Sequence, residues 1–193
     1  MQDERHSAVR ALASSALVTA RLVWARRLRL PRHNVGRHIF FADGSTSRVY
    51  RETTRLEPIR HPAALVVAFR LRLVGRMRLL QAVFRAESIL STPLFAGFPG
   101  FRTKLWLTDE RTGVYRGVYD WEGAGEARHY ATTLARLLRL VCVPGTVVAH
   151  VEDAMRRDEL LEGVGPVEAP TSGSTDRWWV GHVAAASGVW IAT

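Results

Sequence analysis

Four stretches of the chain alternate apolar and polar residues with a period of two. In the first of them Leu65, Val67 and Phe69 form one apolar row, while Arg70 lies in the other row. Alternation of this kind is typical of β-strands, whose successive side chains point to opposite faces. The expected strands cover residues 64–74, 102–108, 114–121 and 146–152. The connection 109–113 contains a glycine, so the second and third strands are expected to form a hairpin.

Two stretches between these strands repeat apolar residues at helical spacing, over residues 77–90 and 123–140. In the second, the expected core stripe consists of Ala127, Tyr130, Ala131, Leu134, Leu138 and Val141. The resulting order is β-α-β-β-α-β. It predicts an α+β fold of the ferredoxin-like type, a four-stranded antiparallel sheet with both helices on one face. The other face is also largely apolar, so we expect the sheet of a second subunit to cover it.

An N-terminal extension precedes this unit. Residues 7–28 carry an amphipathic helix with a basic polar face. It contains too few apolar residues for a transmembrane span. We expect it to pack on the domain, to contact an anionic membrane surface weakly or to meet a partner helix. Residues 38–41 and 47–52 then flank Asp43-Gly44, a strong short-range signal for a β-hairpin.

A C-terminal extension follows the unit. Residues 155–162 predict a short charged helix, and residues 163–175 predict a flexible linker. Three of the six tryptophans then lie within fourteen residues, at Trp178, Trp179 and Trp190. This apolar tail covers a cavity, exchanges onto a partner subunit or stays mobile. The chain thus divides into an N-terminal extension of residues 1–62, a ferredoxin-like domain of residues 63–153 and a C-terminal extension of residues 154–193.

The charge of the chain is unevenly distributed. Its 193 residues carry a formal charge of +9 at pH 7, which at first suggests nucleic-acid binding. However, residues 1–40 hold eight arginines against Asp3 and Glu4, so most of the excess lies before the predicted domain. Lys104 is the only lysine, and the arginine-rich composition resembles the codon bias of a GC-rich genome. We therefore expect no nucleic-acid partner.

Sequence motifs for metals, nucleotides and nucleophilic catalysis are missing. The seven histidines include no metal-binding spacing, and Cys142 is the only cysteine, so the chain can form no internal disulfide. Gly123 and Gly125 precede a helix, but Arg128 stands where a dinucleotide loop has its third glycine. No P-loop or nucleophile elbow is present. We expect a cytoplasmic protein that uses no metal and no cofactor.

The predicted strands carry several polar groups that one cavity can receive. They are Arg70 and Arg72 on the first strand, Lys104 and Trp106 on the second and His150 on the last. Glu87 adds a carboxylate to the otherwise apolar face of the first helix. An arginine or lysine in the cavity can bind a phenolate, enolate or carboxylate and stabilise a developing oxyanion. Glu87 or His150 can move a proton.

Each candidate also has a purely structural interpretation. The strand arginines fit a solvated or interface face, and Glu87 fits an ion pair with a neighbouring arginine. His150 fits a hydrogen-bonded histidine of the sheet. The register is open as well, because a slip of one residue would place Thr103 and Leu105 on the cavity face in place of their neighbours.

One stretch of the chain is similar to a known family. Residues 98–106 read Phe-Pro-Gly-Phe-Arg-Thr-Lys-Leu-Trp, and residues 117–121 read Gly-Val-Tyr-Asp-Trp. Gly113 lies between them, and an Ala-x-x-Tyr helix follows at residues 126–131. These features resemble the YdhR-like family of small monooxygenase-like proteins, within the dimeric α/β-barrel superfamily. The resemblance covers about residues 64–152.

This resemblance implies a homodimer with a mostly apolar cavity that takes a hydrophobic small molecule. Six residues become candidate substrate-binding groups: Arg72, Phe98, Phe101, Trp106, Tyr119 and Trp121. The aromatic ones also fit a plain core. We expect a cofactor-independent tailoring enzyme that acts on a polyketide-like molecule as a monooxygenase, as in antibiotic biosynthesis. A cyclase or isomerase, including one for a cycloaddition, is the alternative enzyme, and a ligand-binding or membrane-surface module is the non-catalytic alternative.

Overall fold

A computed structural model of the chain describes residues 27–72, 95–162 and 178–183, together with Ser14, Val18, Thr19, Arg21 and Trp24 of the N-terminal arm. The expected helix over residues 77–90, with Glu87, and the expected linker therefore lie outside the described residues. So does most of the expected N-terminal helix.

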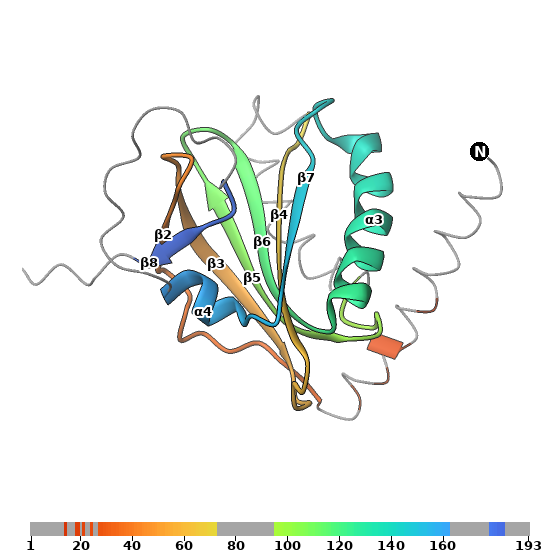
Figure 1. Ribbon diagram of the computed structural model, residues 1–193. Helices are drawn as coiled ribbons and strands as arrows, with labels where there is room; N and C mark the ends of the chain where they lie inside the picture. Colours follow the sequence, from red (N-terminus) through yellow and green to blue (C-terminus); the bar gives the residue numbers. More distant parts are fainter. Residues whose placement is uncertain are drawn as a thin grey trace, which may run out of the picture.

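One curled antiparallel sheet forms the centre of the described structure (Figure 1). Its strands are β1 (Leu28–Arg29), β2 (His38–Phe41), β3 (Thr46–Arg55), β4 (Pro62–Arg70), β5 (Phe101–Asp109), β6 (Val114–Glu122), β7 (Val148–Asp153) and β8 (Gly181–Val183). The strands are arranged in the order β7-β4-β6-β5-β3-β2-β8, and β1 pairs with β3. The α+β class predicted from the sequence is therefore shown.

The strands expected from the sequence are present. Most of their observed ends lie within one or two residues of the predicted ends. The hairpins β2–β3 and β5–β6 are both confirmed. The first predicted strand ends earlier, because β4 stops at Arg70 and Leu71 makes only an isolated bridge to Cys142. The strands β7, β4, β6 and β5 are neighbours in that order. The complete β-α-β-β-α-β arrangement needs the undescribed segment after Arg72, so it stays a prediction.

Helix α3 (Ala124–Val141) covers one face of the sheet. It begins after Gly123, whose positive φ of 85° suits glycine. Its apolar stripe buries Ala127 and Tyr130 against a core of aromatic residues, as the sequence predicted. The prediction fails at the end of the helix, where Val141 is 51% exposed.

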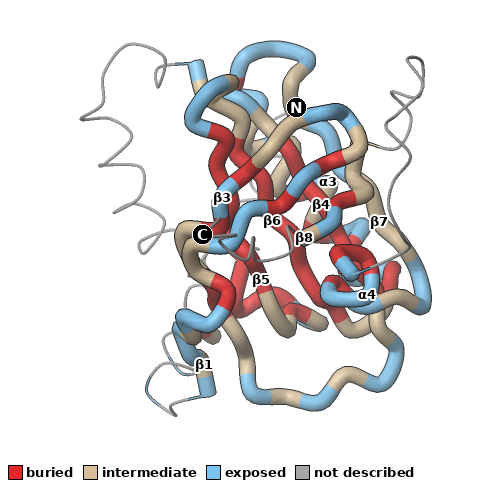
Figure 2. The backbone as a smooth tube through the Cα atoms, turned by 90° about the vertical axis from the view of Figure 1, so that its left-hand side faces the viewer, coloured by how far each residue is buried: buried red, intermediate tan, exposed pale blue. Residues whose placement is uncertain are grey.

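The opposite face is covered by residues of the same chain, not by the sheet of a second subunit as the sequence suggested. Helix α4 (Arg157–Glu162) packs Leu160 and Leu161 against this face, and Trp178, Trp179 and Val183 of the C-terminal extension pack beside them. Figure 1 shows α4 and β8 on the side away from α3, and Figure 2 shows the buried central strands in red. A homodimer is still a prediction, but this face gives no reason for one.

The N-terminal helix ends earlier than predicted. Leu28 belongs to β1, so the helix cannot extend to that residue as expected. Trp24, on its predicted apolar stripe, is 89% exposed.

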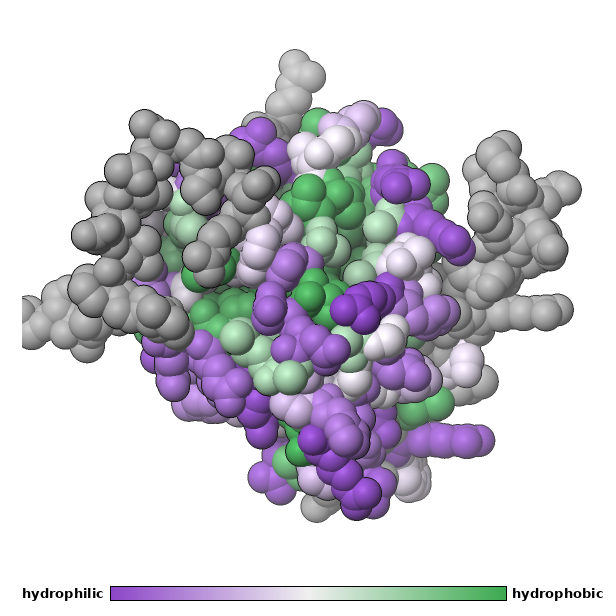
Figure 3. All heavy atoms as spheres, in the orientation of Figure 1, coloured by the Kyte–Doolittle hydropathy of each residue, from purple (hydrophilic) through white to green (hydrophobic). Residues whose placement is uncertain are grey.

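Exposed apolar side chains lie where α3 ends and β7 begins, and they include Leu140 and Val148. Figure 3 shows hydrophobic residues in the upper part of this face of the molecule. No helix within the described part of the chain is long and apolar enough to cross a membrane.

Candidate functional site

The side chain of Lys104 is buried among aromatic rings on the α3 face of the sheet. Its ammonium nitrogen lies 3.1 Å from the centroid of the Trp106 ring, 4.5 Å from that of Phe95 and 4.9 Å from that of Tyr119. Lys104 and Trp106 are two residues apart on β5, so both point to the same face. The register that the sequence left open is thereby resolved in favour of these two residues and against Thr103 and Leu105.

A glycine on the neighbouring strand makes room for this arrangement. In the register of β5 and β6, Gly117 lies opposite Trp106, and Tyr119 lies opposite Lys104. A Cβ atom at Gly117 would come within 2.6 Å of the Tyr119 ring and 2.7 Å of its hydroxyl oxygen. The phenol of Tyr119 therefore lies over Gly117, in the gap that a side chain would fill.

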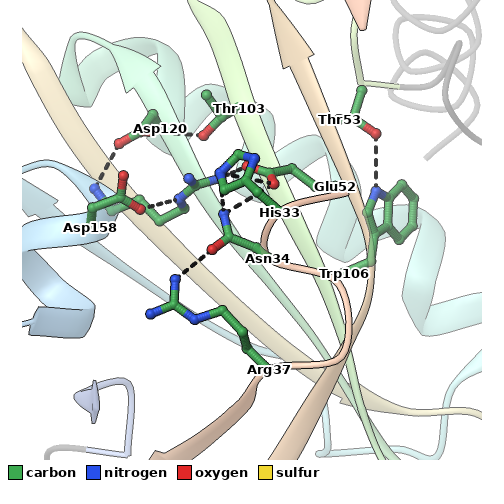
Figure 4. Close-up of polar contacts among 10 residues, drawn as sticks. His33, Asn34, Arg37, Glu52, Thr53, Thr103, Trp106, Asp120 and Asp158 are labelled. Carbon is green, nitrogen blue, oxygen red and sulfur yellow. Dashed lines mark hydrogen bonds and ion pairs between the residues drawn. The ribbon is translucent and has the colours of Figure 1, made fainter. Parts of the chain in front are cut away.

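More aromatic residues extend this cluster toward α3. The Tyr119 hydroxyl is 3.4 Å from the Tyr130 hydroxyl, and the Trp121 ring lies 4.8 Å from that of Tyr130. The Trp121 Nε1 donor is buried and has no hydrogen-bond partner among the residues that the structure describes. In contrast, Trp106 Nε1 donates to Thr53 Oγ1 at 3.3 Å (Figure 4). The cluster thus holds one buried N–H that can donate to a bound molecule.

Burial controls the ionisation of the polar groups in the cluster. It lowers the pKa of Lys104 well below the 10.5 of an ordinary lysine, and the nearby Arg51 guanidinium lowers it further. Burial also raises the pKa of Tyr119 well above its ordinary range, with a further contribution from Tyr130. Among the described residues, Lys104 makes no ion pair with a carboxylate. A lysine in this setting can release its proton more readily than one in water.

A surface pocket adjoins the cluster at the start of α3. Its volume is about 370 Å³, and its lining includes Phe98, Glu126 and His129. Phe98 also packs edge-on against Tyr130, with ring centroids 5.3 Å apart, so this ring separates the pocket from the aromatic cluster. Glu126 and His129 lie one helical turn apart. Neither residue was a candidate from the sequence, although both belong to the stretch that resembles the family.

The structure brings together six of the residues predicted from the sequence. Those on the α3 face, or packed within its core, are Lys104, Trp106, Phe98, Phe101, Tyr119 and Trp121. Arg70 and Arg72 do not join them. Both are exposed at the end of β4, where the Arg70 guanidinium donates to the backbone carbonyl of Thr112 and the backbone N–H of Arg72 donates to Val141.

His150 lies on the other face of the sheet. It pairs with Val66 in the register of β4 and β7, and Val66 belongs to the core under α4. Its ring stacks on Trp179 with centroids 3.6 Å apart, and its Nε2 is 2.9 Å from Glu152 Oε2. The expectation that strand alternation aims His150 and Lys104 into one cavity is therefore wrong. This position agrees with the alternative of a hydrogen-bonded sheet histidine.

The described residues contain no group of three His, Cys, Asp or Glu side chains placed to hold a metal ion. Cys142 is a buried free thiol, and burial raises its pKa to about 11. Gly123 and Gly125 are simply the start of α3, as predicted from the sequence. The polar group that the described residues place among the aromatic rings is the Lys104 amine.

Comparison with known proteins does not assign the chain to a family. The chain matches no protein-family model and no curated protein. One similar solved structure is an uncharacterized ferredoxin fold protein related to antibiotic biosynthesis monooxygenases, from Listeria monocytogenes. It is 16% identical, with a TM-score of 0.39, and the match covers 57% of this chain and 64% of that one.

A second similar structure is an anthrone oxidase-like protein. It is 15% identical, with a TM-score of 0.33, and the match covers 58% of each chain. The matched regions span less than two thirds of either known chain. At these TM-scores, neither likeness bears on what this chain does.

Proposed function

We propose that the protein is a cytoplasmic, cofactor-independent monooxygenase that acts on a hydrophobic, polyketide-like aromatic molecule and works as a homodimer. One observation carries the catalytic part of this proposal. Lys104 is buried against three aromatic rings, and no described carboxylate neutralises it. A substrate that becomes an aromatic anion supplies the missing negative charge, and its ring can pack against the same aromatic side chains.

Lys104 supports the chemistry of such a substrate in two steps. As a neutral amine it takes a proton from an activated C–H group, and the ammonium so formed stabilises the delocalised anion. The anion then transfers electrons to O₂ and forms a carbon–oxygen bond, and protonation yields a hydroperoxide. Loss of water from the hydroperoxide leaves a carbonyl group. A CH₂ group and O₂ are thereby converted to C=O and H₂O, which balances without a reductant.

The substrate reaches this position from the adjoining pocket. Lys104 and Trp106 are almost fully buried, at 6% and 7% exposed, so entry requires that Phe98 moves aside. The adjoining pocket of about 370 Å³ lies within the range of small-molecule sites. Glu126 and His129 line this pocket and are further polar groups that a bound molecule can contact.

Anthrone is a suitable probe, because its CH₂ group loses a proton to give a delocalised aromatic anion. Purified protein is incubated with anthrone under air and under nitrogen, and anthraquinone formation and O₂ consumption are recorded. We expect conversion above the uncatalysed rate only under air, with one O₂ consumed for each quinone. Lys104→Met should fall to the uncatalysed rate, whereas the exposed control Arg128→Gln should match the wild type.

Two outcomes would overturn this function: equal rates with and without oxygen, or full activity of Lys104→Met in a folded protein. Rearrangement of a polyketide-like substrate under nitrogen would favour the cyclase or isomerase. The homodimer is tested separately by sedimentation equilibrium, where the mass of a single chain at all concentrations would exclude it.

A further inference from the structure

A second cavity lies on the face of the sheet opposite Lys104. Its volume is about 210 Å³, and it is enclosed by the loop before β2, by β3 and β5, by α4 and by β8. Its apolar lining consists of Ile39, Val49, Leu105, Leu161 and Val183. This space corresponds to about seven water molecules, which suits a molecule of the size of one amino acid.

The polar wall of this cavity is built on a buried ion pair. Glu52 accepts a hydrogen bond from Arg157 Nη1 at 3.1 Å, and both side chains are almost fully buried. The backbone N–H of Arg157 donates to Asp120, and its Nε donates to Asp158. Burial alone would lower the pKa of Arg157, but Asp158, Asp120 and Glu52 raise it above the ordinary value. The Arg157 guanidinium is therefore shared by two carboxylates, those of Glu52 and Asp158.

Asn34 connects this wall to the rim of the cavity. Its Nδ2 group donates to Glu52 at 3.0 Å and also lies 2.8 Å from His33 Nε2, while its Oδ1 accepts from Arg37 Nη1 at 2.6 Å. Figure 4 shows these side chains converging from the loop and from β3. Arg37 is thus held at the cavity by a neutral amide, and the residue is exposed to solvent.

Two solvent-exposed side chains of opposite charge, Arg37 and Glu162, line the cavity. Within residues 27–72, 95–162 and 178–183, no carboxylate forms an ion pair with Arg37, and no cation forms one with Glu162. Asp158 also lines the cavity, but Arg157 already binds it. A ligand that carries both a carboxylate and an ammonium group can form an ion pair with each of these two side chains, whereas a ligand with a single charge can pair with only one.

From this combination we infer that the cavity binds an apolar α-amino acid as its zwitterion. Its carboxylate pairs with Arg37, its ammonium group pairs with Glu162, and its side chain packs on Leu105, Leu161 and Val183. His33, which is largely exposed at the rim, can add a hydrogen bond to the carboxylate. Because the site lies on the other face of the sheet from Lys104, it is independent of the proposed oxygenase function.

The test compares three ligands of nearly equal shape. L-Leucine carries both charges, isocaproate lacks the ammonium group and isopentylamine lacks the carboxylate. Binding to the full chain is measured by calorimetry. Changes in the NMR chemical shifts of the Leu105 and Val183 methyl groups show whether the ligand binds in this cavity. We expect leucine to bind best and each analogue to bind about tenfold more weakly or worse, as for the loss of a charged hydrogen bond.

Substitutions assign each charge to its partner. Arg37→Gln should lower the affinity for leucine and isocaproate about tenfold and leave the affinity for isopentylamine unchanged. Glu162→Gln should lower the affinity for leucine and isopentylamine and leave the affinity for isocaproate unchanged. Arg128→Gln and Glu159→Gln, which do not line the cavity, should bind all three ligands like the wild type. Thermal unfolding confirms that each variant is folded.

Three results of the binding measurements would overturn the site. They are the absence of leucine binding, equal binding of all three ligands, and an equal loss for all ligands in a folded Arg37 or Glu162 variant. Leucine binding that shifts no methyl group of Leu105 or Val183 would place it elsewhere and would also reject the site.

Discussion

The ammonium nitrogen of Lys104 lies 3.1 Å from the centroid of the Trp106 ring. A cation over an indole is stabilised by about 2 kcal/mol when both groups are desolvated. Burying a charged amine without a carboxylate partner costs more than this, and the lowered pKa of Lys104 reflects the difference. The fold thus holds an amine in a place where its neutral form is favoured.

The first prediction concerns the titration of this amine. Since Lys104 is the only lysine, reductive methylation with labelled formaldehyde gives one signal from a lysine ε-amine. The N-terminal α-amine gives a separate signal. We expect its pKa to lie clearly below 10.5 in the folded protein and to return to that value in denaturant, because burial and Arg51 lower it only in the fold. An unchanged ordinary value in the folded state would contradict the buried site.

The second prediction concerns the pH dependence of stability. In the window between the lowered pKa of Lys104 and 10.5, the unfolded chain binds more protons than the folded chain, so stability rises with pH. Below this window the lysine destabilises the fold by about 1.4 kcal/mol for each unit of pKa shift. Lys104→Met should therefore be more stable than the wild type below the window, and the difference should shrink as pH rises through it. Urea unfolding of both proteins measures this, and a constant difference would refute it.

The third prediction concerns Gly117. A methyl group there meets the Tyr119 ring at 2.6 Å, so Gly117→Ala should displace the phenol and cost about 1–3 kcal/mol of unfolding free energy. It should also lower the anthrone oxidation rate. Gly125→Ala is the matched control, since nothing lies within 4 Å of its added methyl group, and it should be neutral or slightly stabilising in α3. Equal effects of the two substitutions would contradict the packing described for Tyr119.

Local patterns in the sequence were enough to predict the strands and their hairpins. Asp43-Gly44 and the connection ending at Gly113 are turn signals that act over a few residues, and the structure has both hairpins. The buried stripe of α3 could be predicted in the same way, because its apolar residues, including Tyr130, recur at the helical period. In each case the signal and the structure that it predicts lie within the same short segment.

These patterns could not show which side chains of distant strands point to the same face of the sheet. Ala63 to Ala68 are all buried, so β4 has no polar face to show which side of β7 points toward α3. His150 therefore could not be placed relative to Lys104. Glu52 was missed for a similar reason: a glutamate in a strand suggests a solvent-facing position, and its partner Arg157 lies 105 residues later in the chain.

The last prediction concerns this buried pair. Arg157→Met leaves the Glu52 carboxylate buried with Asn34 as its remaining hydrogen-bond donor among the described contacts, so it should lower the unfolding free energy by about 3–5 kcal/mol. Glu52→Gln should cost less, because Asp158 still accepts from Arg157. The double variant should cost less than the sum of the two, since it leaves no buried Glu52 carboxylate without its guanidinium partner, and Asp158, which also loses Arg157, is 61% exposed. Urea unfolding of the four proteins provides the cycle, with the exposed neighbour Arg156→Met as a control that should change stability by less than about 0.5 kcal/mol. Strict additivity would show that the two charges do not stabilise each other in the fold.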